Sequence, residues 1–217
     1  KYGDRLLVVE PPPEPLKPEE LDRVHELPYA RRPHPKYKGR IPAFETIKDS
    51  IQAVRGCPGG CAFCGLVVHQ GRHVMSRSED SILRELDTIA KCPNFKGTIS
   101  DVGGAAGNIY GSRYDLERCR KCRRSSCLFP APCPNYVCTG LETLHLLRRM
   151  RKHPKVKHLY INSGIRLDLA LRQPELLREI IAHHVSGHMK VAPEHLHPTV
   201  LKLMRKSPAE EFYKFME

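Results

Sequence analysis

Arg55-Gly56-Cys57-Pro58-Gly59-Gly60-Cys61-Ala62-Phe63-Cys64 is the stretch around which this chain is organised, because it places three cysteines within eight residues. Three residues separate the first two cysteines, and two residues separate the last two. The proline and the paired glycines favour tight turns, which can wrap a short loop around a compact object. Cysteine thiolates are the usual ligands of iron–sulfur clusters, and three of them would leave one iron of a [4Fe–4S] cube open.

A structural zinc site is the alternative for these cysteines. Zinc in such sites takes four ligands, mostly cysteine and histidine, and His69 would be the fourth here. Disulfide bonds are less suitable, because three cysteines cannot pair evenly and no signal peptide opens the sequence. Nine cysteines in a chain of this character favour metal binding, and we expect a cytoplasmic protein.

The spacing C-x3-C-x2-C, with the aromatic Phe63 before the last cysteine, resembles the signature of radical S-adenosylmethionine (SAM) enzymes. Longer stretches, from about Glu10 to the last residue, resemble the YgiQ-like family of uncharacterised radical SAM proteins. These stretches are Arg55-Gly56-Cys57, Gly71-Arg72, 76–81, 97–104, 163–168 and 192–195. The resemblance implies that Cys57, Cys61 and Cys64 hold a [4Fe–4S] cluster, and that SAM binds its open iron.

The same resemblance implies a radical SAM enzyme as the function. A one-electron reductant such as a flavodoxin or ferredoxin would reduce the cluster. SAM would then be cleaved to methionine and a 5′-deoxyadenosyl radical, which would remove hydrogen from a substrate. No motif in the sequence names that substrate, and no residue is singled out as catalytic beyond the cofactor sites.

Gly103 and Gly104 follow the second expected strand, where the family pattern places a contact to the SAM amino group. Glycines let the backbone approach a ligand closely. Many relatives have an acidic residue next, whereas this chain has Ala105. An amino-group contact would therefore come from the backbone or from Asp101. An ordinary turn at the end of a strand is the competing interpretation.

Polar residues also follow the third and fourth expected strands. Ser163 and Arg166 are expected near SAM, because a guanidinium can pair with the SAM carboxylate. A simple contact between Arg166 and Asp168 is the alternative. Glu194 would accept from the ribose hydroxyls or the amino group, and His195 would be either a proton donor or a surface residue.

A second group of cysteines lies at residues 119–138, and its central part resembles the family's own cysteine-rich stretch. Such density of thiols indicates a second metal centre, either zinc or an auxiliary iron–sulfur cluster, and each needs four ligands. The four expected ligands are Cys119, Cys122, Cys127 and Cys133. Cys138 would be spare, and Cys92 an unliganded thiol.

Strand-like and helix-like segments alternate from residue 47 onward, which predicts a parallel sheet with helical crossovers. The cluster loop then lies at the carboxyl end of a strand, where barrel enzymes carry their active sites. The expected strands are 47–54, 97–102, 158–163 and 188–192. The first expected helix follows a capping box at Ser76–Glu79, and its inward residues are Ile82, Leu83, Leu86 and Ile89. The second is 139–152, and its inward residues are Leu141, Leu144, Leu147 and Met150. The other expected helices are 174–185, 198–205 and 208–217.

The expected fold class is α/β, a partial (β/α) barrel of the radical SAM type with an N-terminal extended arm. Residues 1–42 would be the proline-rich arm, with a strand at 5–9 and a helix at 18–27. Residues 43–217 would be the barrel, with a cysteine-rich insertion at 113–138. Radical SAM enzymes resembling this chain have six strands, so we expect a truncated barrel whose last two strands lie beyond Glu217.

The net charge of +12 suits nucleic acid or anionic cofactors, and no run of eighteen apolar residues predicts a membrane span. Two alternatives to a radical SAM enzyme of unknown substrate follow. One is an RNA-modifying enzyme resembling methylthiotransferases, and the other is a non-catalytic zinc module that binds RNA. A phosphate-bearing partner would meet the basic residues of the insertion, which are Arg113, Arg118, Arg120, Lys121, Arg123 and Arg124.

Overall fold

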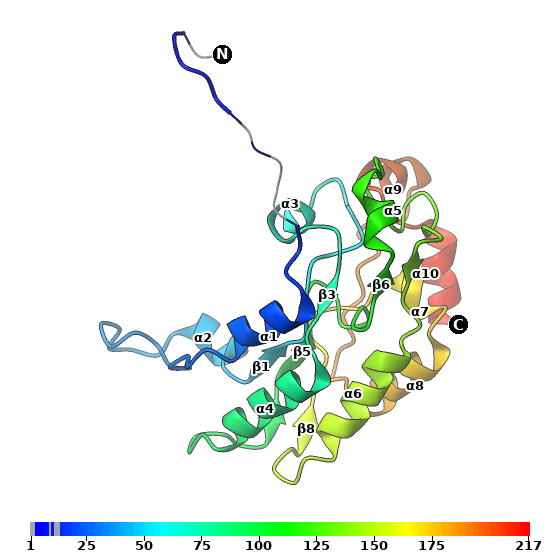
Figure 1. Ribbon diagram of the computed structural model, residues 1–217. Coiled ribbons are helices and arrows are strands. Elements are labelled where there is room, and N and C mark those ends of the chain that lie inside the picture. The colour runs from blue at the N-terminus through cyan, green and yellow to red at the C-terminus, as the bar shows by residue number, and fades with distance from the viewer. Residues whose placement is uncertain (1–2, 9, 11–13) are drawn as a thin grey trace.

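Short parallel strands at the centre of the molecule follow one another in chain order (Figure 1). The computed structural model describes residues 3–8, 10 and 14–217. β1 (Ser50–Gln52) pairs with β5 (Asp101–Gly103), and β4 (Thr98–Ile99) pairs with β8 (His158–Leu159), both in parallel. Ser100 joins β4 to β5, so the second expected strand lies between the first and the third. This is the order in which a (β/α) barrel begins.

Three expected strands differ from the structure, and of the one expected at 158–163 only His158–Leu159 forms a strand. Residues 47–54 divide among the last residue of α2 (Pro42–Ile47), β1 and the start of β2 (Val54–Arg55), which turns antiparallel to β3 (Met75–Ser76). The fourth expected strand, 188–192, is reduced to one parallel bridge between Ile165 and Val191, and its alternate residues His188 and Lys190 are exposed. The described part of the chain therefore forms an arc of parallel strands and no closed barrel.

Three helices pack in a row along the outside of these strands: α4 (Glu79–Ala90), α6 (Leu141–Arg151) and α8 (Pro174–His183). α4 buries Ile82, Leu86 and Ile89 as expected, and Leu83 is partly buried. On α6 the expected inward residue Leu141 is 56% exposed, whereas Leu146 is buried. Leu141 is the first residue of its helix and faces away from the core.

The N-terminus of α4 differs from the expected capping box. Ser78, not Ser76, caps the helix, because its Oγ accepts from the backbone N–H of Ser81 at 3.1 Å. Ser76 Oγ instead accepts from the backbone N–H of Gly111. A serine directly before the first helical residue is the usual N-cap, so the helix begins two residues later than the motif suggested.

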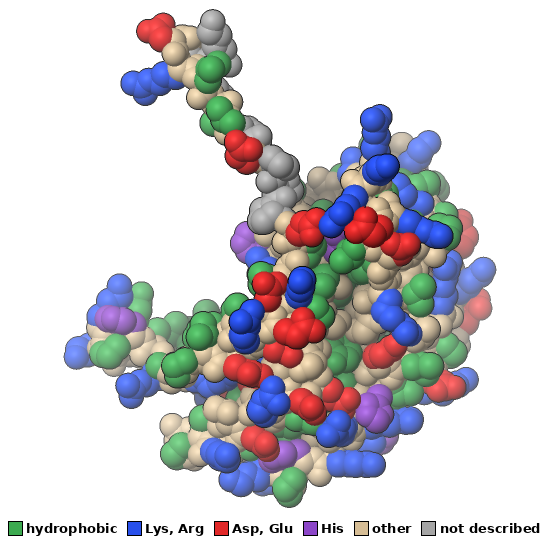
Figure 2. Space-filling view, in the orientation of Figure 1, with side chains coloured by type: hydrophobic (Ala, Val, Ile, Leu, Met, Phe, Trp, Pro, Cys, Tyr) green, Lys and Arg blue, Asp and Glu red, His purple; other side chains and the backbone are tan. Residues whose placement is uncertain are grey.

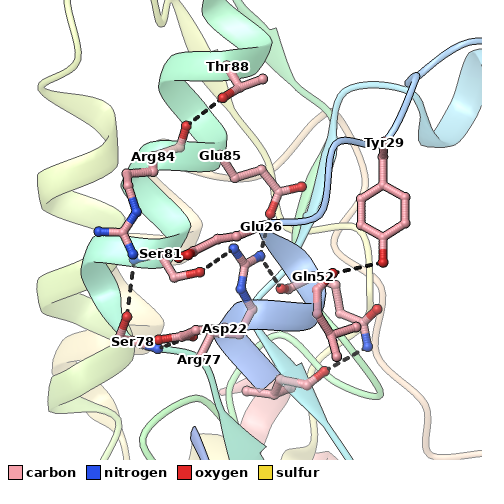
Figure 3. A network of polar contacts seen from close by, with 12 residues as sticks. Asp22, Glu26, Tyr29, Gln52, Arg77, Ser78, Ser81, Arg84, Glu85 and Thr88 are labelled. Atoms are coloured by element: carbon pink, nitrogen blue, oxygen red, sulfur yellow. Dashed lines mark hydrogen bonds and ion pairs between the residues drawn. The ribbon is translucent and has the colours of Figure 1, made fainter. Parts of the chain in front are cut away.

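The N-terminal arm contains α1 (Pro18–His25), which ends two residues before the predicted boundary, and α2 begins at the last residue of the arm, Pro42. The strand expected at 5–9 is wrong for residues 5–8, where Leu6, Leu7 and Val8 are exposed; Val9 lies outside the described residues. Polar contacts join the arm to α4, among them Arg31 with Glu85. Figure 3 shows another, between Arg84 and Glu26.

The remaining elements lie in the two cysteine regions and in the chain that follows β8. They are α3 (Leu66–Gln70), β6 (Arg113–Tyr114), α5 (Leu116–Arg120), β7 (Tyr136–Val137), α7 (Leu167–Ala170), α9 (Pro198–Met204) and α10 (Ala209–Met216). β6 and β7 form an antiparallel pair that closes the expected insertion. Among the described residues, no helix has the length and apolar character needed to cross a membrane.

Candidate functional site

The first cysteine loop connects β2 to α3. Cys57 is buried, and Cys61 and Cys64 are half-buried. The Cys57 N–H donates to the carbonyl of Gly71 at 3.1 Å, and the Cys64 N–H donates to the carbonyl of Cys61 at 3.1 Å. These bonds close the loop at its base and shape its end as a tight turn, and Cys61 and Cys64 lie near enough to Cys57 for their charges to raise its pKa.

Glycine is required at the entrance of this loop. Gly56 has a φ of +96°, and a Cβ built there would lie 2.1 Å from the backbone oxygen of His73. Its N–H donates to Gln70 Oε1, which holds the end of α3 against the loop. A side chain at this position would separate the loop from the segment that returns beneath it.

Arg166 sits under the loop. Its Nε and Nη2 donate to the two carboxylate oxygens of Asp168, at 3.0 and 2.5 Å, and a Cβ built on Gly59 would lie 2.1 Å from its Nη1. Burial raises the pKa of the Cys57 thiol, while the Gly59 backbone and the Arg166 charge oppose that shift. The guanidinium thus supplies a fixed positive charge beside thiols that must ionise to bind metal.

The position of His69 bears on the two metal hypotheses for this loop. His69, the expected fourth zinc ligand, is exposed on α3. In an iron–sulfur cube each thiolate binds a different iron, so the thiols surround the group instead of meeting at one point. The donor set and its spacing therefore fit a cluster.

A pocket of about 470 Å³ lies beside this loop. Its walls come from β1, from β5 with Gly104 and Ala105, from Ser163, and from Leu66 and Gln70 on α3. α3 begins two residues after Cys64, so the pocket shares a wall with the cysteine loop. The carboxyl ends of parallel strands meet here, which is where barrel enzymes bind their ligands.

The second cysteine group forms a neighbourhood of its own. The Cys122 N–H donates to the carbonyl of Cys119 at 3.0 Å, and the Cys133 N–H donates to the carbonyl of Cys127 at 2.7 Å. Burial raises the pKa of Cys127 to about 11, and the charges of the other three thiols add to that rise. The four expected ligands are thus brought near one another. Cys138 is held elsewhere, with its Sγ donating to the carbonyl of Asn108.

The two cysteine loops interlock. The Cys127 N–H donates to the carbonyl of Pro58 at 2.9 Å, and the Ser126 hydroxyl donates to the carbonyl of Gly59 at 2.6 Å. Gly60 has a φ of +59°, and a Cβ built there would lie 2.1 Å from the backbone oxygen of Ser125. The second loop is therefore part of the wall around the first.

Comparison with known families shows to which family this chain belongs. A family model described as the radical SAM superfamily matches residues 51–217, and one described as radical SAM N-terminal matches residues 1–50. The chain belongs to the radical SAM superfamily. The radical SAM superfamily model covers both cysteine groups and, apart from Ser50, the parallel strands and the pocket.

Several relatives of this radical SAM chain carry the name UPF0313 protein, which confirms the predicted YgiQ-like family. The chain is 46% identical to the one from Porphyromonas gingivalis, over 98% of this chain and 36% of that protein. It is also 46% identical to the one from Geobacter sulfurreducens and 45% identical to the one from Methanocella arvoryzae, over the whole of this chain and 36% of each relative. The chain thus spans about a third of the length of these relatives.

The residues expected to bind SAM fall into two sets. Gly103, Gly104 and Ser163 line the pocket. Arg166 lies outside it in its pair with Asp168. Glu194, with a φ of +67°, also lies outside, and its carboxylate is 3.9 Å from Lys206 Nζ. The exposed His195 accepts from the backbone N–H of His197 through its Nδ1.

Asp101, the other acidic group at the pocket, is engaged within the protein. It accepts from the backbone N–H groups of Asn162 and Ser163, at 2.7 and 3.0 Å, and from the Ser163 hydroxyl. A Cβ on Gly103 would lie 2.8 Å from Ser163 Oγ, and one on Gly104 would lie 2.6 Å from a Val54 methyl. The paired glycines thus serve close packing at the strand end as well as access to the pocket.

Residues that sequence reasoning missed lie between the two cysteine loops. Arg72 donates to the carbonyls of Arg124 and Cys122, and Ser126 binds the first loop. Gln70 holds Gly56, as described above. Arg72 stood in a stretch that resembles the family, but nothing there indicated its partners. Ser126 carried no signal apart from its place between cysteines.

The basic residues of the insertion are largely paired within the protein. Arg113 contacts Glu142, Arg118 contacts Asp115, and Arg120 contacts Glu14 and Glu117. Arg124 turns inward onto three backbone carbonyls, whereas Lys121 and Arg123 are exposed. Figure 2 shows Lys and Arg side chains interspersed with Asp and Glu on the visible face. This mixture gives little support to an extended phosphate-binding surface.

Proposed function

We propose that this radical SAM chain binds a [4Fe–4S] cluster through Cys57, Cys61 and Cys64, and SAM in the adjoining pocket. The observation that carries the proposal is the shared wall: α3 follows the cysteine loop directly and also lines the pocket of Gly103, Gly104 and Ser163. A ligand in the pocket would therefore lie next to the open side of a cluster in the loop.

When both are bound, the reduced cluster and SAM supply the 5′-deoxyadenosyl radical that removes hydrogen from a substrate. The chain's own residues would hold and enclose them. The glycines at the end of β5 leave room for backbone contacts to the SAM amino group. Ser163, fixed by Asp101, presents its side chain at the same wall. Arg166 keeps a positive charge under the loop, and a flavodoxin or ferredoxin would deliver the electron.

The test is SAM cleavage by the anaerobically reconstituted protein with a chemical reductant. Cys61→Ala should remove the iron–sulfur absorbance of the first site and abolish formation of 5′-deoxyadenosine, measured by liquid chromatography. The matched control is Cys92→Ala, because Cys92 is exposed at the end of α4 and far along the chain from either cysteine loop. A Cys61→Ala protein that still produces 5′-deoxyadenosine at the wild-type rate would refute the proposal.

A further inference from the structure

The second cysteine group has features of a metal site that the proposed function does not use. Its four thiols are free, and two of them, Cys119 and Cys127, are buried. Two backbone turns fix the pairs Cys119 with Cys122 and Cys127 with Cys133. Four free thiols on one loop, two buried and two half-buried, supply the number of ligands that one metal centre needs.

A structural zinc ion and an iron–sulfur cluster would both use the four thiols. A structural zinc ion needs four ligands that converge tetrahedrally, at about 2.3 Å from each sulfur. A cluster with a thiolate on each iron needs the sulfurs to surround a larger volume. This group packs against the first cysteine loop, for which a cluster is proposed above, and a second cluster is the corresponding centre here.

Polar groups around the second site also suit a cluster. Asn135 Nδ2 donates to Cys119 Sγ at 3.1 Å, and donors to cluster-binding sulfurs are among the means by which proteins tune such centres. The guanidinium of Arg72 holds the carbonyls of Cys122 and Arg124, which brings a positive charge into the loop. That charge would offset the negative charge of four thiolates.

We infer that Cys119, Cys122, Cys127 and Cys133 bind a second iron–sulfur cluster, packed against the loop of the first. All four ligands come from protein, so this cluster has no open iron for SAM. Its existence does not depend on SAM cleavage at the first site, and the two ideas can fail separately.

The experiment begins with the wild-type protein, reconstituted anaerobically with iron and sulfide in the presence of zinc. Iron, sulfide and zinc are then assayed on one sample, with a Mössbauer spectrum to count cluster types. About eight irons and eight sulfides per chain, without zinc, are expected for two cubes. About one zinc per chain, or about four irons that all belong to a SAM-sensitive cluster, would overturn the inference even if every variant proved unstable.

Variants then assign the iron to its ligands. Cys122→Ala should lose about four irons relative to wild type, while the remaining cluster signal still changes when SAM is added. Cys138→Ala is the matched control, because that cysteine lies in the same insertion but its Sγ is bound to Asn108. It should keep the full iron content. Cys61→Ala should lose the SAM-sensitive irons and keep the others. An unchanged iron content in Cys122→Ala would refute the second cluster.

Discussion

At the scale of the residue, Gly60 does what no other residue could do at its position. Its backbone has a φ of +59°, and the Ser125 carbonyl occupies the space where a side chain would begin. Gly65, five residues later, has a φ of −78° and nothing within 4 Å of its missing Cβ. The two positions therefore differ in what they require: the backbone at Gly60 leaves no room for a side chain, whereas the backbone at Gly65 does.

Gly60→Ala should destabilise the protein by at least about 2 kcal/mol, because it combines left-handed strain with a clash against backbone. The measurement is denaturant unfolding of the metal-free protein under reducing conditions. Gly65→Ala is the control and should change the free energy of unfolding by less than about 0.5 kcal/mol. Equal effects of the two substitutions would show that the loops do not pack as described.

At the scale of the element, His184 joins α8 to the strand layer. It follows the last residue of α8, and its ring is fully buried. Nδ1 donates to the carbonyl of Leu159 at 2.8 Å, and Nε2 lies 3.7 Å from Glu179. Burial lowers the pKa of His184, and the hydrogen bond to Leu159 and the attraction of Glu179 offset that effect only in part.

A lowered pKa means that the unfolded chain takes up the proton first as pH falls. The folded protein should therefore lose stability below about pH 6.5, the ordinary histidine value. His184→Gln removes this titration, so the stability difference between wild type and variant should shrink between pH 7.5 and 5.5. Urea unfolding at these two values provides the measurement. A difference that stays constant would show that His184 does not contribute to the acid sensitivity.

At the scale of the whole molecule, a buried ion pair network connects the N-terminal arm to the strand and helix layers (Figure 3). Glu85 on α4 accepts from Arg31 of the arm and from Arg77, whose side chain is completely buried. Arg77 also donates to the Gln52 carbonyl at 3.0 Å and to Ser81 Oγ at 2.8 Å. The Glu85 carboxylate thus binds one arginine from each of the segments that the two family models match.

Glu85→Ala should cost roughly 3–5 kcal/mol, because it leaves the Arg77 charge buried without a carboxylate partner. Chemical denaturation of the metal-free protein measures the loss. Glu26→Ala is the matched control, since it removes the exposed partner of Arg84 on the same helix, and it should have little effect. If the two variants lose the same free energy of unfolding, the buried Arg77–Glu85 pair contributes no more to stability than the exposed pair of Arg84 and Glu26.

Local patterns predicted much of this architecture. The spacing of Cys57, Cys61 and Cys64 placed a cysteine loop after a strand, and the alternation of strands and helices predicted the parallel order. Contacts between distant segments were beyond such reasoning. Ser126 meets Gly59 across 67 residues, and no local propensity encodes that bond. The segment 188–192 alternated like a strand but forms a single bridge, because pairing partners decide whether such a segment becomes a strand.

The interlocked loops also determine when the first site can mature during synthesis. Gly59 leaves the ribosome's active centre 67 residues before Ser126, and translation proceeds at about 5–20 residues per second. For roughly 3–13 s the nascent chain therefore carries Cys57, Cys61 and Cys64 without the segment that covers their backbone. Once these thiols have left the ribosome, they are open to oxidants and to competing metals until the covering segment has also emerged. Delivery of iron and sulfide to this protein is thus best timed after residue 127 has been made.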